Sequence, residues 1–287
     1  MATIMDGKAL AAEIDKTTTV RIQRLADQGI VPGLVVILVG DDPASKIYVR
    51  NKERRAKKMK INSIVRNLPD TISEADLIKI IQTYNENPTI HAILVQLPLP
   101  AHINEFNVTN AIAPEKDADG FHPTNIGKLV INHTEKTPIA CTPQGIMSIF
   151  NAYHIDLDGK KAVVVGRSTI VGKPMAALLV NANATVTVAH SHTHNLSQLT
   201  READILVVAV GIAKYIKEAD VKSDAVVIDV GMDRDVNGKL VGDVDFAEVE
   251  RKASYITPVP KGVGPMTITT LISQTVALAE WSSEKNG

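Results

Sequence analysis

A tyrosine and a lysine are spaced so that both can act on one small molecule. Tyr48 and Lys52 are four residues apart, after the turn residues Gly40-Asp-Asp-Pro-Ala-Ser45. On a helix this spacing puts both side chains on one face. The ring can stack on a planar substrate and shelter the ammonium group from water, and a sheltered lysine can act as an acid or a base. The alternative is a solvent-exposed basic face, because many Lys and Arg residues surround Lys52.

Polar residues that follow the third apolar segment form a second group. Gln96 ends a predicted strand, and ligands bind beyond the carboxyl ends of strands in open α/β sheets. A neutral amide there can position a lysine or a water molecule. Asp117 and Asp119 follow in a turn before Gly120. A carboxylate can accept two hydrogen bonds from an aminopyrimidine edge. The alternatives are a glutamine that caps a strand and aspartates that only shape the turn.

A strand, a turn and a helix start are predicted over residues 162–180. Branched apolar residues lead into Gly166, and Gly172 and Pro174 precede an apolar run. A helix start leaves N–H groups unpaired and can bind a phosphate, and Pro174 fits the first helical position. The segment lacks G-x-G-x-x-G, since Ser168 and Val171 replace glycines, and Pro174 replaces the hydroxyl residue of a P-loop. The alternative is a plain strand-to-helix turn.

The end of the next predicted strand favours NADP over NAD. An acidic residue usually follows this strand and binds the ribose 2′-hydroxyl of NAD. Here the strand over 185–189 ends in His190-Ser191-His192-Thr193-His194, without a carboxylate. Arg167, Ser168, His190 and Ser191 can instead donate hydrogen bonds to a 2′-phosphate. The alternating histidines also have the spacing of a metal site on a strand. We expect no metal, because no acidic residue or cysteine lies near them in sequence.

Predicted helices and strands alternate along the chain. We expect helices over 7–28, 45–59, 74–84, 142–153 and 267–281, with Ser45 and Ser73 as N-caps. We expect strands over 33–39, 61–65, 92–96, 161–165, 185–189, 205–210 and 225–230. Residues 113–127 break the pattern and indicate a domain boundary. The alternation predicts an α/β fold with two doubly wound α/β domains, of which the C-terminal one is Rossmann-type.

Composition excludes several classes of protein. The chain has 287 residues, of which 45% are hydrophobic, 22% are charged and only 3% are aromatic. A core of Val, Ile, Leu and Ala favours parallel sheets that are buried on both faces. The net charge of −1 indicates no attraction to nucleic acid or to an anionic membrane surface. Cys141 is the only cysteine, and neither a signal peptide nor a membrane span is apparent, so we expect a cytoplasmic protein.

Seven segments together resemble the bifunctional methylenetetrahydrofolate dehydrogenase/methenyltetrahydrofolate cyclohydrolase family. They span nearly the whole chain in the family's order. They are Val39-Gly-Asp-Asp-Pro-Ala-Ser45, Tyr48-Val-Arg-Asn-Lys52, Val95-Gln-Leu-Pro-Leu-Pro100, Lys116-Asp-Ala-Asp-Gly120, Cys141-Thr-Pro-x-Gly145, Gly166-Arg-Ser-x-Ile-Val-Gly172-x-Pro174 and Thr257-Pro-Val-Pro-x-Gly-Val-Gly-Pro-Met-Thr267. The resemblance implies a folate-binding catalytic domain over 1–139, to which a last helix over 267–287 returns, and an NADP-binding domain over 140–266.

The resemblance also implies roles for single residues. Lys52 is similar to the family's acid/base lysine, Tyr48 to its stacking tyrosine, Gln96 to the glutamine that tunes the lysine, and Asp119 to its pterin-binding carboxylate. The implied cofactor-binding residues are Gly166, Arg167, Ser168, Ile170, Gly172, Pro174, His190, Ser191 and Gly211. The implied substrate-binding residues, besides Tyr48 and Asp119, are Leu97, Pro98, Pro260, Gly262, Gly264 and Pro265.

Two lysines depart from the family pattern. Lys60 follows the catalytic helix where glycine is usual, and Lys261 replaces a glycine of the Pro-Gly-Gly-Val-Gly-Pro loop. A helix end of this kind often needs a positive φ, so we expect a changed or strained cap at Lys60.

The implied function is a two-step conversion of a folate, in a cytoplasmic homodimer without a metal. NADP-dependent oxidation of 5,10-methylenetetrahydrofolate gives the methenyl compound, which is hydrolysed to 10-formyltetrahydrofolate. The substrates are tetrahydrofolate derivatives, and basic residues near Lys52 (Arg50, Arg54 and Lys57) suggest polyglutamated ones. The alternatives are a monofunctional dehydrogenase and a non-catalytic nucleotide-sensing module.

Overall fold

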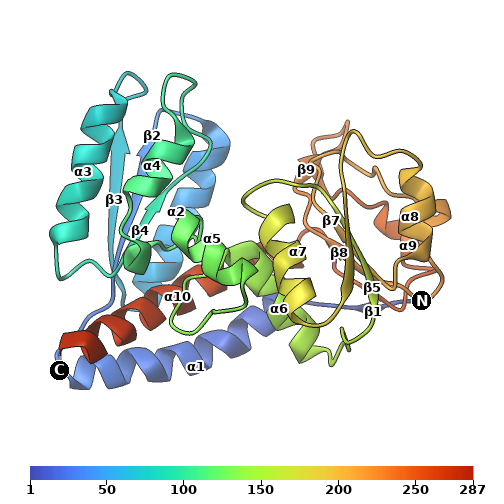
Figure 1. The fold of residues 1–287 in the computed structure, drawn as a ribbon, viewed down its shortest axis with the longest axis horizontal. Helices are drawn as coiled ribbons and strands as arrows, with labels where there is room; N and C mark the ends of the chain where they lie inside the picture. Colours follow the sequence, from blue (N-terminus) through green and yellow to red (C-terminus); the bar gives the residue numbers. More distant parts are fainter. Residues whose placement is uncertain (287) are drawn as a thin grey trace. The chain divides into compact units, whose positions relative to one another are not determined.

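A computed structural model describes residues 1–286 (Figure 1). The chain divides into two compact units. Unit 1 comprises Met1–Glu13 and Ala140–Thr267, and unit 2 comprises Ile14–Ile139 and the chain from Ile268 onward. Each unit contains a parallel sheet. The expectation of an α/β fold with a parallel sheet in each domain is therefore confirmed.

The sheet of unit 2 has three parallel strands in the order β3-β2-β4: β3 is Asn62–Leu68, β2 is Gly33–Val39 and β4 is Ala92–Val95. Every residue of β2 is buried, as its unbroken apolar sequence indicates. One face of the sheet packs on α3 (Glu74–Glu86) and α4 (Glu105–Ala111) through a cluster that includes Val35, Ile37, Leu77 and Ile81. The connections from β2 and β4 leave from the same sheet edge, where a ligand crevice is expected.

Helix α2 (Pro43–Lys58) connects β2 to β3 in unit 2. Its N-cap is Asp42, whose carboxylate accepts a hydrogen bond from Ser45 N at 2.7 Å, with Pro43 in the first turn. The prediction that Ser45 is the cap is therefore wrong: an aspartate followed by proline can begin the helix earlier. The accepted hydrogen bond also holds the pKa of Asp42 below its usual value.

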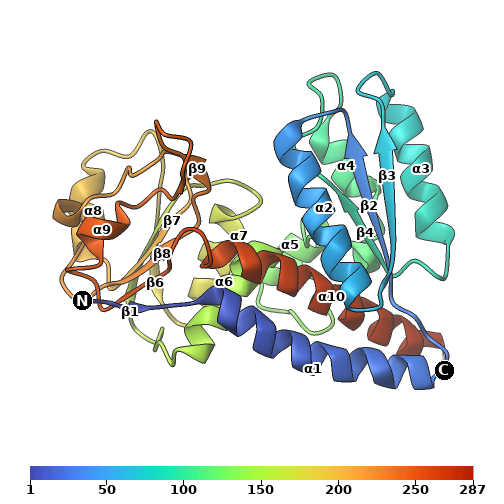
Figure 2. The same cartoon turned by 180° about the vertical axis from the view of Figure 1, so that it is seen from behind.

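Two long helices complete unit 2. Helix α1 (Gly7–Asp27) and helix α10 (Val263–Asn286) each begin in unit 1 and continue in unit 2. Within unit 2 they lie side by side (Figures 1 and 2), and Arg21 Nη2 is 2.6 Å from Glu280 Oε2. The expected last helix is therefore present, and it contacts the first. The expected boundary region 113–127 lies inside unit 2, where it forms a 3-10 turn (Pro114–Lys116) and helix α5 (Pro123–Val130).

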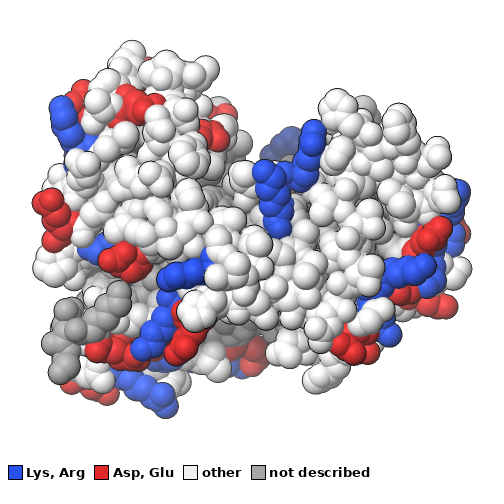
Figure 3. Space-filling model, viewed as in Figure 1, with Lys and Arg blue, Asp and Glu red and all other residues white. Residues whose placement is uncertain are grey.

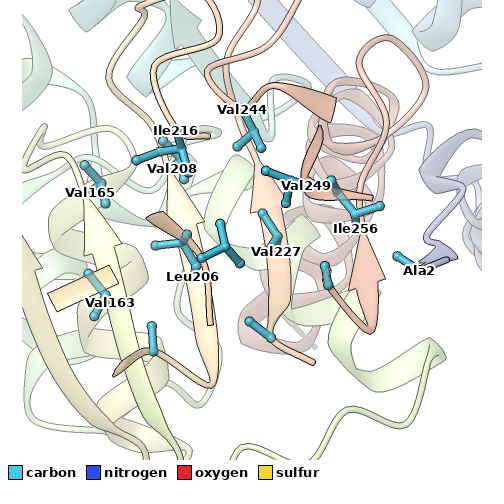
Figure 4. Packing of buried hydrophobic residues seen from close by; sticks show 14 of the residues in the cluster. Ala2, Val163, Val165, Leu206, Val208, Ile216, Val227, Val244, Val249 and Ile256 are labelled. Atoms are coloured by element: carbon cyan, nitrogen blue, oxygen red, sulfur yellow. The ribbon is translucent and has the colours of Figure 1, made fainter. Parts of the chain in front are cut away.

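The sheet of unit 1 has six parallel strands in the order β1-β11-β8-β7-β5-β6. Their side chains form an aliphatic core (Figure 4) that includes Val163, Leu206, Val227 and Ile256. The strands are β1 (Thr3–Ile4), β11 (Tyr255–Ile256), β8 (Val226–Asp229), β7 (Ile205–Val208), β5 (Lys161–Val165) and β6 (Thr185–Ala189). The helices are α6 (Cys141–Ala152), α7 (Gly172–Asn181), α8 (Leu196–Glu202), α9 (Phe246–Val249) and a 3-10 turn at Glu218–Asp220.

The two-residue strands β1 and β11 are absent from the predicted elements, because a single pair of residues carries no periodic signal. The pairing of Thr3 with Tyr255 places residues 1–13 with unit 1, whereas the sequence-based division assigned them to the other domain. A short antiparallel hairpin of β9 (Asp233–Arg234) and β10 (Leu240–Val241) follows β8.

Charge is spread over the molecule without one dominant sign. On the face in Figure 3, acidic and basic side chains are interspersed within each unit. Several acidic and basic side chains of the described chain form ion pairs, such as Lys57 with Glu53 and Lys222 with Asp204. Among the residues described, no helix is long and apolar enough to span a bilayer.

Candidate functional site

Lys52 and Gln96 contact each other at the carboxyl edge of the unit 2 sheet. Lys52 is 8% exposed on the third turn of α2, and its Nζ donates to Gln96 Oε1 at 2.9 Å. Gln96 follows β4, and its own Nε2 donates to Leu97 O at 2.7 Å. This second bond fixes the amide so that its oxygen faces the ammonium group. Because the amide oxygen of Gln96 is neutral and does not take up the proton, Lys52 Nζ can still transfer one to a bound molecule.

Tyr48 lies one turn before Lys52 on α2. Its side chain is partly exposed, with 37% of the residue's surface accessible. Burial of the remainder raises the pKa of its hydroxyl above the usual value. The ring is therefore neutral and available at the surface of unit 2, as a stacking role requires.

Asp119 lies in a turn that Asp117 holds. The buried carboxylate of Asp117 accepts hydrogen bonds from Gly120 N at 3.0 Å, His122 N at 2.8 Å and Asn125 Nδ2 at 2.9 Å. Desolvation raises the pKa of Asp119 to about 6, against the opposing effect of the Lys52 charge. The charge of Asp117 adds to the increase. Lys52, Gln96 and Asp119 therefore belong to one electrostatic cluster, and Asp117 is a structural residue of the turn.

A small hollow adjoins this cluster in unit 2. Its walls are mostly apolar, and Asp117 and Asp119 supply its carboxylates. It is lined by Ile93, Leu94, Val95, Leu97, Thr109, Ile112, Asp117, Asp119 and Phe121. Leu97 lines the hollow, and Leu97–Pro98 is a cis peptide.

The turn between β5 and α7 requires both of its glycines. Gly166 has φ +123°, and a Cβ there would lie 2.3 Å from Ala209 O. A Cβ on Gly172 would lie 2.1 Å from Gly166 O. The turn is thus closed tightly at the point where β5 leaves the sheet between β6 and β7. This is the switch point at which dinucleotides bind in open parallel sheets.

The first N–H groups of α7 are already bonded within the protein, contrary to the expected phosphate cradle. Ser168 Oγ accepts from Val171 N at 3.1 Å and from Gly172 N at 3.3 Å, and Ser168 O accepts from Lys173 N at 3.0 Å. Pro174 occupies the third helical position rather than the first, and it has no N–H to donate. An anion at this helix start would therefore rely on the helix dipole and on the exposed turn before it.

The residues proposed for a 2′-phosphate lie at the ends of β5 and β6. Arg167, Ser168, Ile170 and Ser191 are exposed, and His190 is half-buried after β6. Desolvation lowers the pKa of His190, and the positive charge of Arg167 lowers it further. Arg167 and His190 therefore interact electrostatically at the ends of β5 and β6. The rings of His190 and His192 meet edge to face at 6.0 Å, and residues 1–286 contain no metal-binding group of His, Cys, Asp and Glu.

Gly211 follows β7 with φ +68°. Sequence reasoning missed the residue that shapes this turn, Asp243, whose carboxylate accepts from Val210 N and Ile212 N at 2.7 and 2.8 Å. Asp243 lies more than thirty residues further along the chain. Its pattern Gly-Asp-Val-Asp resembles an ordinary turn, so no local signal could have identified it.

The loop over 257–267 lies in unit 1. Val259–Pro260 is a cis peptide, and a Cβ on Gly262 would lie 2.5 Å from Pro258 O. Gly264 and Pro265 are half-buried in the first turn of α10. Lys261 has φ +88° and Lys60 has φ +59°, so both lysines adopt the left-handed backbone that the glycine pattern demands. The backbone is therefore strained at Lys60, just after α2, and at Lys261 in the loop before α10.

The proposed site residues therefore form two groups. Tyr48, Lys52, Gln96, Leu97, Pro98 and Asp119 belong to unit 2, whereas the proposed cofactor residues and the 260–265 loop belong to unit 1. The first group can exchange protons with a bound planar molecule. The second offers a tight glycine turn at a sheet switch point, with basic groups at the end of the second strand.

Two family models match successive parts of the chain. Residues 5–119 match the catalytic domain of the tetrahydrofolate dehydrogenase/cyclohydrolase family, and residues 140–283 match its NAD(P)-binding domain. The chain is 65% identical to the bifunctional protein FolD of Pediococcus pentosaceus over 98% of this chain and 100% of that one.

Two solved structures are similar over the whole fold. The bifunctional FolD enzyme of Campylobacter jejuni has 48% identity and a TM-score of 0.96, covering 98% of this chain and 99% of that one. The FolD of Trypanosoma brucei, solved with NADP cofactor and inhibitor, has 37% identity and a TM-score of 0.94, covering 98% of each chain. The chain belongs to the tetrahydrofolate dehydrogenase/cyclohydrolase family.

Proposed function

We propose that this member of the family acts on folates with NADP rather than NAD. It is a bifunctional enzyme that oxidises 5,10-methylenetetrahydrofolate to the methenyl compound and hydrolyses that compound to 10-formyltetrahydrofolate. The observation that carries the assignment of the chemistry is the buried Lys52–Gln96 hydrogen bond beside the Asp119 carboxylate.

In the hydrolytic step, Lys52 moves the proton. Water adds to the cationic methenyl carbon and loses one proton, which leaves a hydroxyl group on that carbon. The ring opens when one ring nitrogen takes up a proton and its bond to this carbon breaks, while the hydroxyl loses its proton and becomes the formyl C=O, so that one proton is released overall. Among the proposed residues of unit 2, Lys52 is the one that carries an amine, and its nitrogen can donate or accept a proton. Gln96 orients it, since Oε1 of the amide accepts from Nζ at 2.9 Å.

Asp119 and Tyr48 hold the substrate. A carboxylate in the hollow can accept two hydrogen bonds from an aminopyrimidine, and these bonds need its ionised form. The ring of Tyr48 stacks on the flat pterin. The exposed side chains of Arg50 and Arg54 lie on the same helix and are available to a polyglutamate tail.

In the oxidative step, the NADP⁺ held by unit 1 would supply the hydride acceptor for the methylene carbon. The product cation is stabilised by its own nitrogens, so the protein mainly positions the reactants. Arg167, Ser168, His190 and Ser191 would hold the 2′-phosphate. Support comes from the electrostatic effect of Arg167 on His190, from the absence of a carboxylate at the end of β6, and from the NADP complex of the Trypanosoma brucei relative.

One assay tests these assignments together. The absorbance of NADPH and that of methenyltetrahydrofolate are followed in the same reaction, with NADP⁺ and then with NAD⁺ at equal low concentration. We expect faster turnover with NADP⁺. The variant Lys52→Met should retain cofactor reduction and lose ring opening by at least a hundredfold. Normal ring opening in Lys52→Met would exclude the role of the lysine, and equal rates with NAD⁺ would exclude the preference. Binding of the cofactor without turnover would indicate a sensing module.

The assembly is part of the same proposal. We expect a homodimer in the cytoplasm, on the basis of the family resemblance and of a chain with a single cysteine. Light scattering coupled to size-exclusion chromatography measures the mass directly, and a monomeric mass at micromolar concentration would exclude the dimer.

A further inference from the structure

Three carboxylates meet at the carboxyl edge of the unit 1 sheet without a cationic partner. Asp229 ends β8, Asp233 begins β9 and Asp243 follows β10. Within the described chain, none of the three forms an ion pair with a lysine or an arginine. Asp229 is satisfied by the backbone N–H groups of Gly231, Asp243 and Val244 at 2.9 to 3.0 Å. The other two carboxyl groups therefore need a different explanation.

The carboxylate of Asp243 binds the backbone of the turn at Gly211. It is completely buried, and its two oxygens accept separately from Val210 N at 2.7 Å and Ile212 N at 2.8 Å. These two N–H groups stand on either side of Gly211, whose φ is +68°. One carboxylate thus fixes the backbone before and after the glycine. Replacement of either oxygen would leave a donor of the turn unpaired.

The surrounding backbone is shaped to admit these carboxylates. A Cβ on Gly231 would lie 2.7 Å from Asp243 Oδ1, and a Cβ on Gly242 would lie 1.9 Å from Asp229 Oδ2. Real Cβ atoms cannot approach an oxygen so closely. Both glycines are therefore required for the position of the carboxylates.

Asp233 is the remaining member of the group. Its Oδ2 atom is buried and has no hydrogen-bond partner. Burial and the neighbouring Asp243 raise the pKa of Asp233 to about 6. Asp243 also acts electrostatically on Asp229, and Lys214 and Lys217, which follow the Gly211 turn in the chain, are paired with Asp245. A protonated Asp233 can donate to Asp243, whereas an ionised one repels it.

We propose that Asp243 is the positioning residue of the Gly211 turn, and that the proton on Asp233 keeps Asp243 seated against that turn. The consequence is an affinity for the nucleotide cofactor that depends on both carboxyl groups. This inference rests on the proposed function, because Gly211 is there a cofactor-binding residue.

The first experiment measures the dissociation constant of NADP⁺ by isothermal titration calorimetry. Asp243→Asn replaces one acceptor oxygen by an amide that faces a backbone donor, and we expect binding at least tenfold weaker. Asp158→Asn removes an exposed carboxylate of the same unit and should stay within twofold of the wild type. Wild-type affinity in Asp243→Asn overturns the proposal. Absence of NADP⁺ binding to the wild type would instead refute the proposed function.

The second experiment tests the role of the proton on Asp233. It also tests the proposal when Asp243→Asn does not fold. Asp233→Asn supplies a permanent N–H donor in place of the titrating O–H. The ratio of the wild-type to the variant dissociation constant is measured at pH 5 and pH 8. Titration of the cofactor phosphate and of His190 occurs in both proteins and cancels in this ratio. We expect the ratio to rise at least threefold as Asp233 ionises, and a ratio that is constant with pH overturns the proposal.

Discussion

The carboxylate proposed to bind the pterin should destabilise the protein that carries it. The pKa of Asp119 is about 6 in the folded chain, against an ordinary value of 3.8. For a carboxyl group whose pKa is raised, folding disfavours the ionised form. The penalty is therefore present above the folded pKa and disappears as the pH falls below the unfolded pKa. Linkage gives a penalty of about 3 kcal/mol at pH 7, about 1.5 kcal/mol at pH 5 and about 0.5 kcal/mol at pH 4.

The variant Asp119→Asn tests this reasoning, because an amide has nearly the same shape and no charge to desolvate. We expect its free energy of unfolding at pH 7 to exceed that of the wild type by about 3 kcal/mol, and the gain to shrink at pH 4. Its catalytic efficiency should fall, since an amide presents only one acceptor to the aminopyrimidine. Stability would thus be gained where function is lost.

Urea denaturation at pH 7, 5 and 4 measures the effect. The two units can unfold separately, so the wild type and the variant are compared in the transition in which unit 2, which contains Asp119, unfolds. The control Asp70→Asn changes an exposed aspartate of the same unit and should alter stability by less than about 0.5 kcal/mol. If Asp119→Asn were less stable than the wild type at pH 7, or if its gain did not depend on pH, the carboxylate would not be desolvated as the structure indicates.

Two backbone positions give further predictions. Lys60→Gly should stabilise the protein by about 0.5–1 kcal/mol, because Lys60 has φ +59°, whereas Arg50→Gly at an exposed position in the middle of α2 should destabilise it. Thermal unfolding measures both effects, and a loss of stability in Lys60→Gly would contradict the strain. Gly172→Ala should weaken NADP⁺ binding at least tenfold, since its Cβ would lie 2.1 Å from Gly166 O. Gly127→Ala, with open space around its Cβ, is the control, and unchanged NADP⁺ affinity in Gly172→Ala would refute the close approach.

Local sequence patterns predicted much of the fold. Strands β2, β5 and β6 have the expected bounds, because each is an apolar segment between turn residues. The helix that carries Tyr48 and Lys52 was expected from the same kind of evidence. Its start was misplaced by two residues, since Asp42, Pro43 and Ser45 all favour a helix N-terminus and the sequence does not rank them.

The site was predicted less completely. Spacing placed Tyr48 and Lys52 on one helical face, but it gave no information about the distance from Lys52 to Gln96. That 2.9 Å contact depends on how β2 and β4 pair and on where α2 packs. Likewise, the turn after Gly166 was expected to offer the N–H groups of α7, whereas Ser168 already accepts from them.

The sequence by itself determined the alternation of strands and helices, the absence of a carboxylate after β6, and the motifs by which the family is recognised. These features are local, and each depends on residues a few positions apart. Only the tertiary structure decided that Gln96 orients Lys52, that Asp117 holds the turn of Asp119, and that Asp243 supports Gly211. The contacts of Gln96 and Asp243 join residues more than thirty positions apart in the chain, whereas the turn of Asp117 is local and depends on the burial of its carboxylate. They depend on the burial of polar groups, whose hydrogen bonds must be satisfied by whatever the fold brings near.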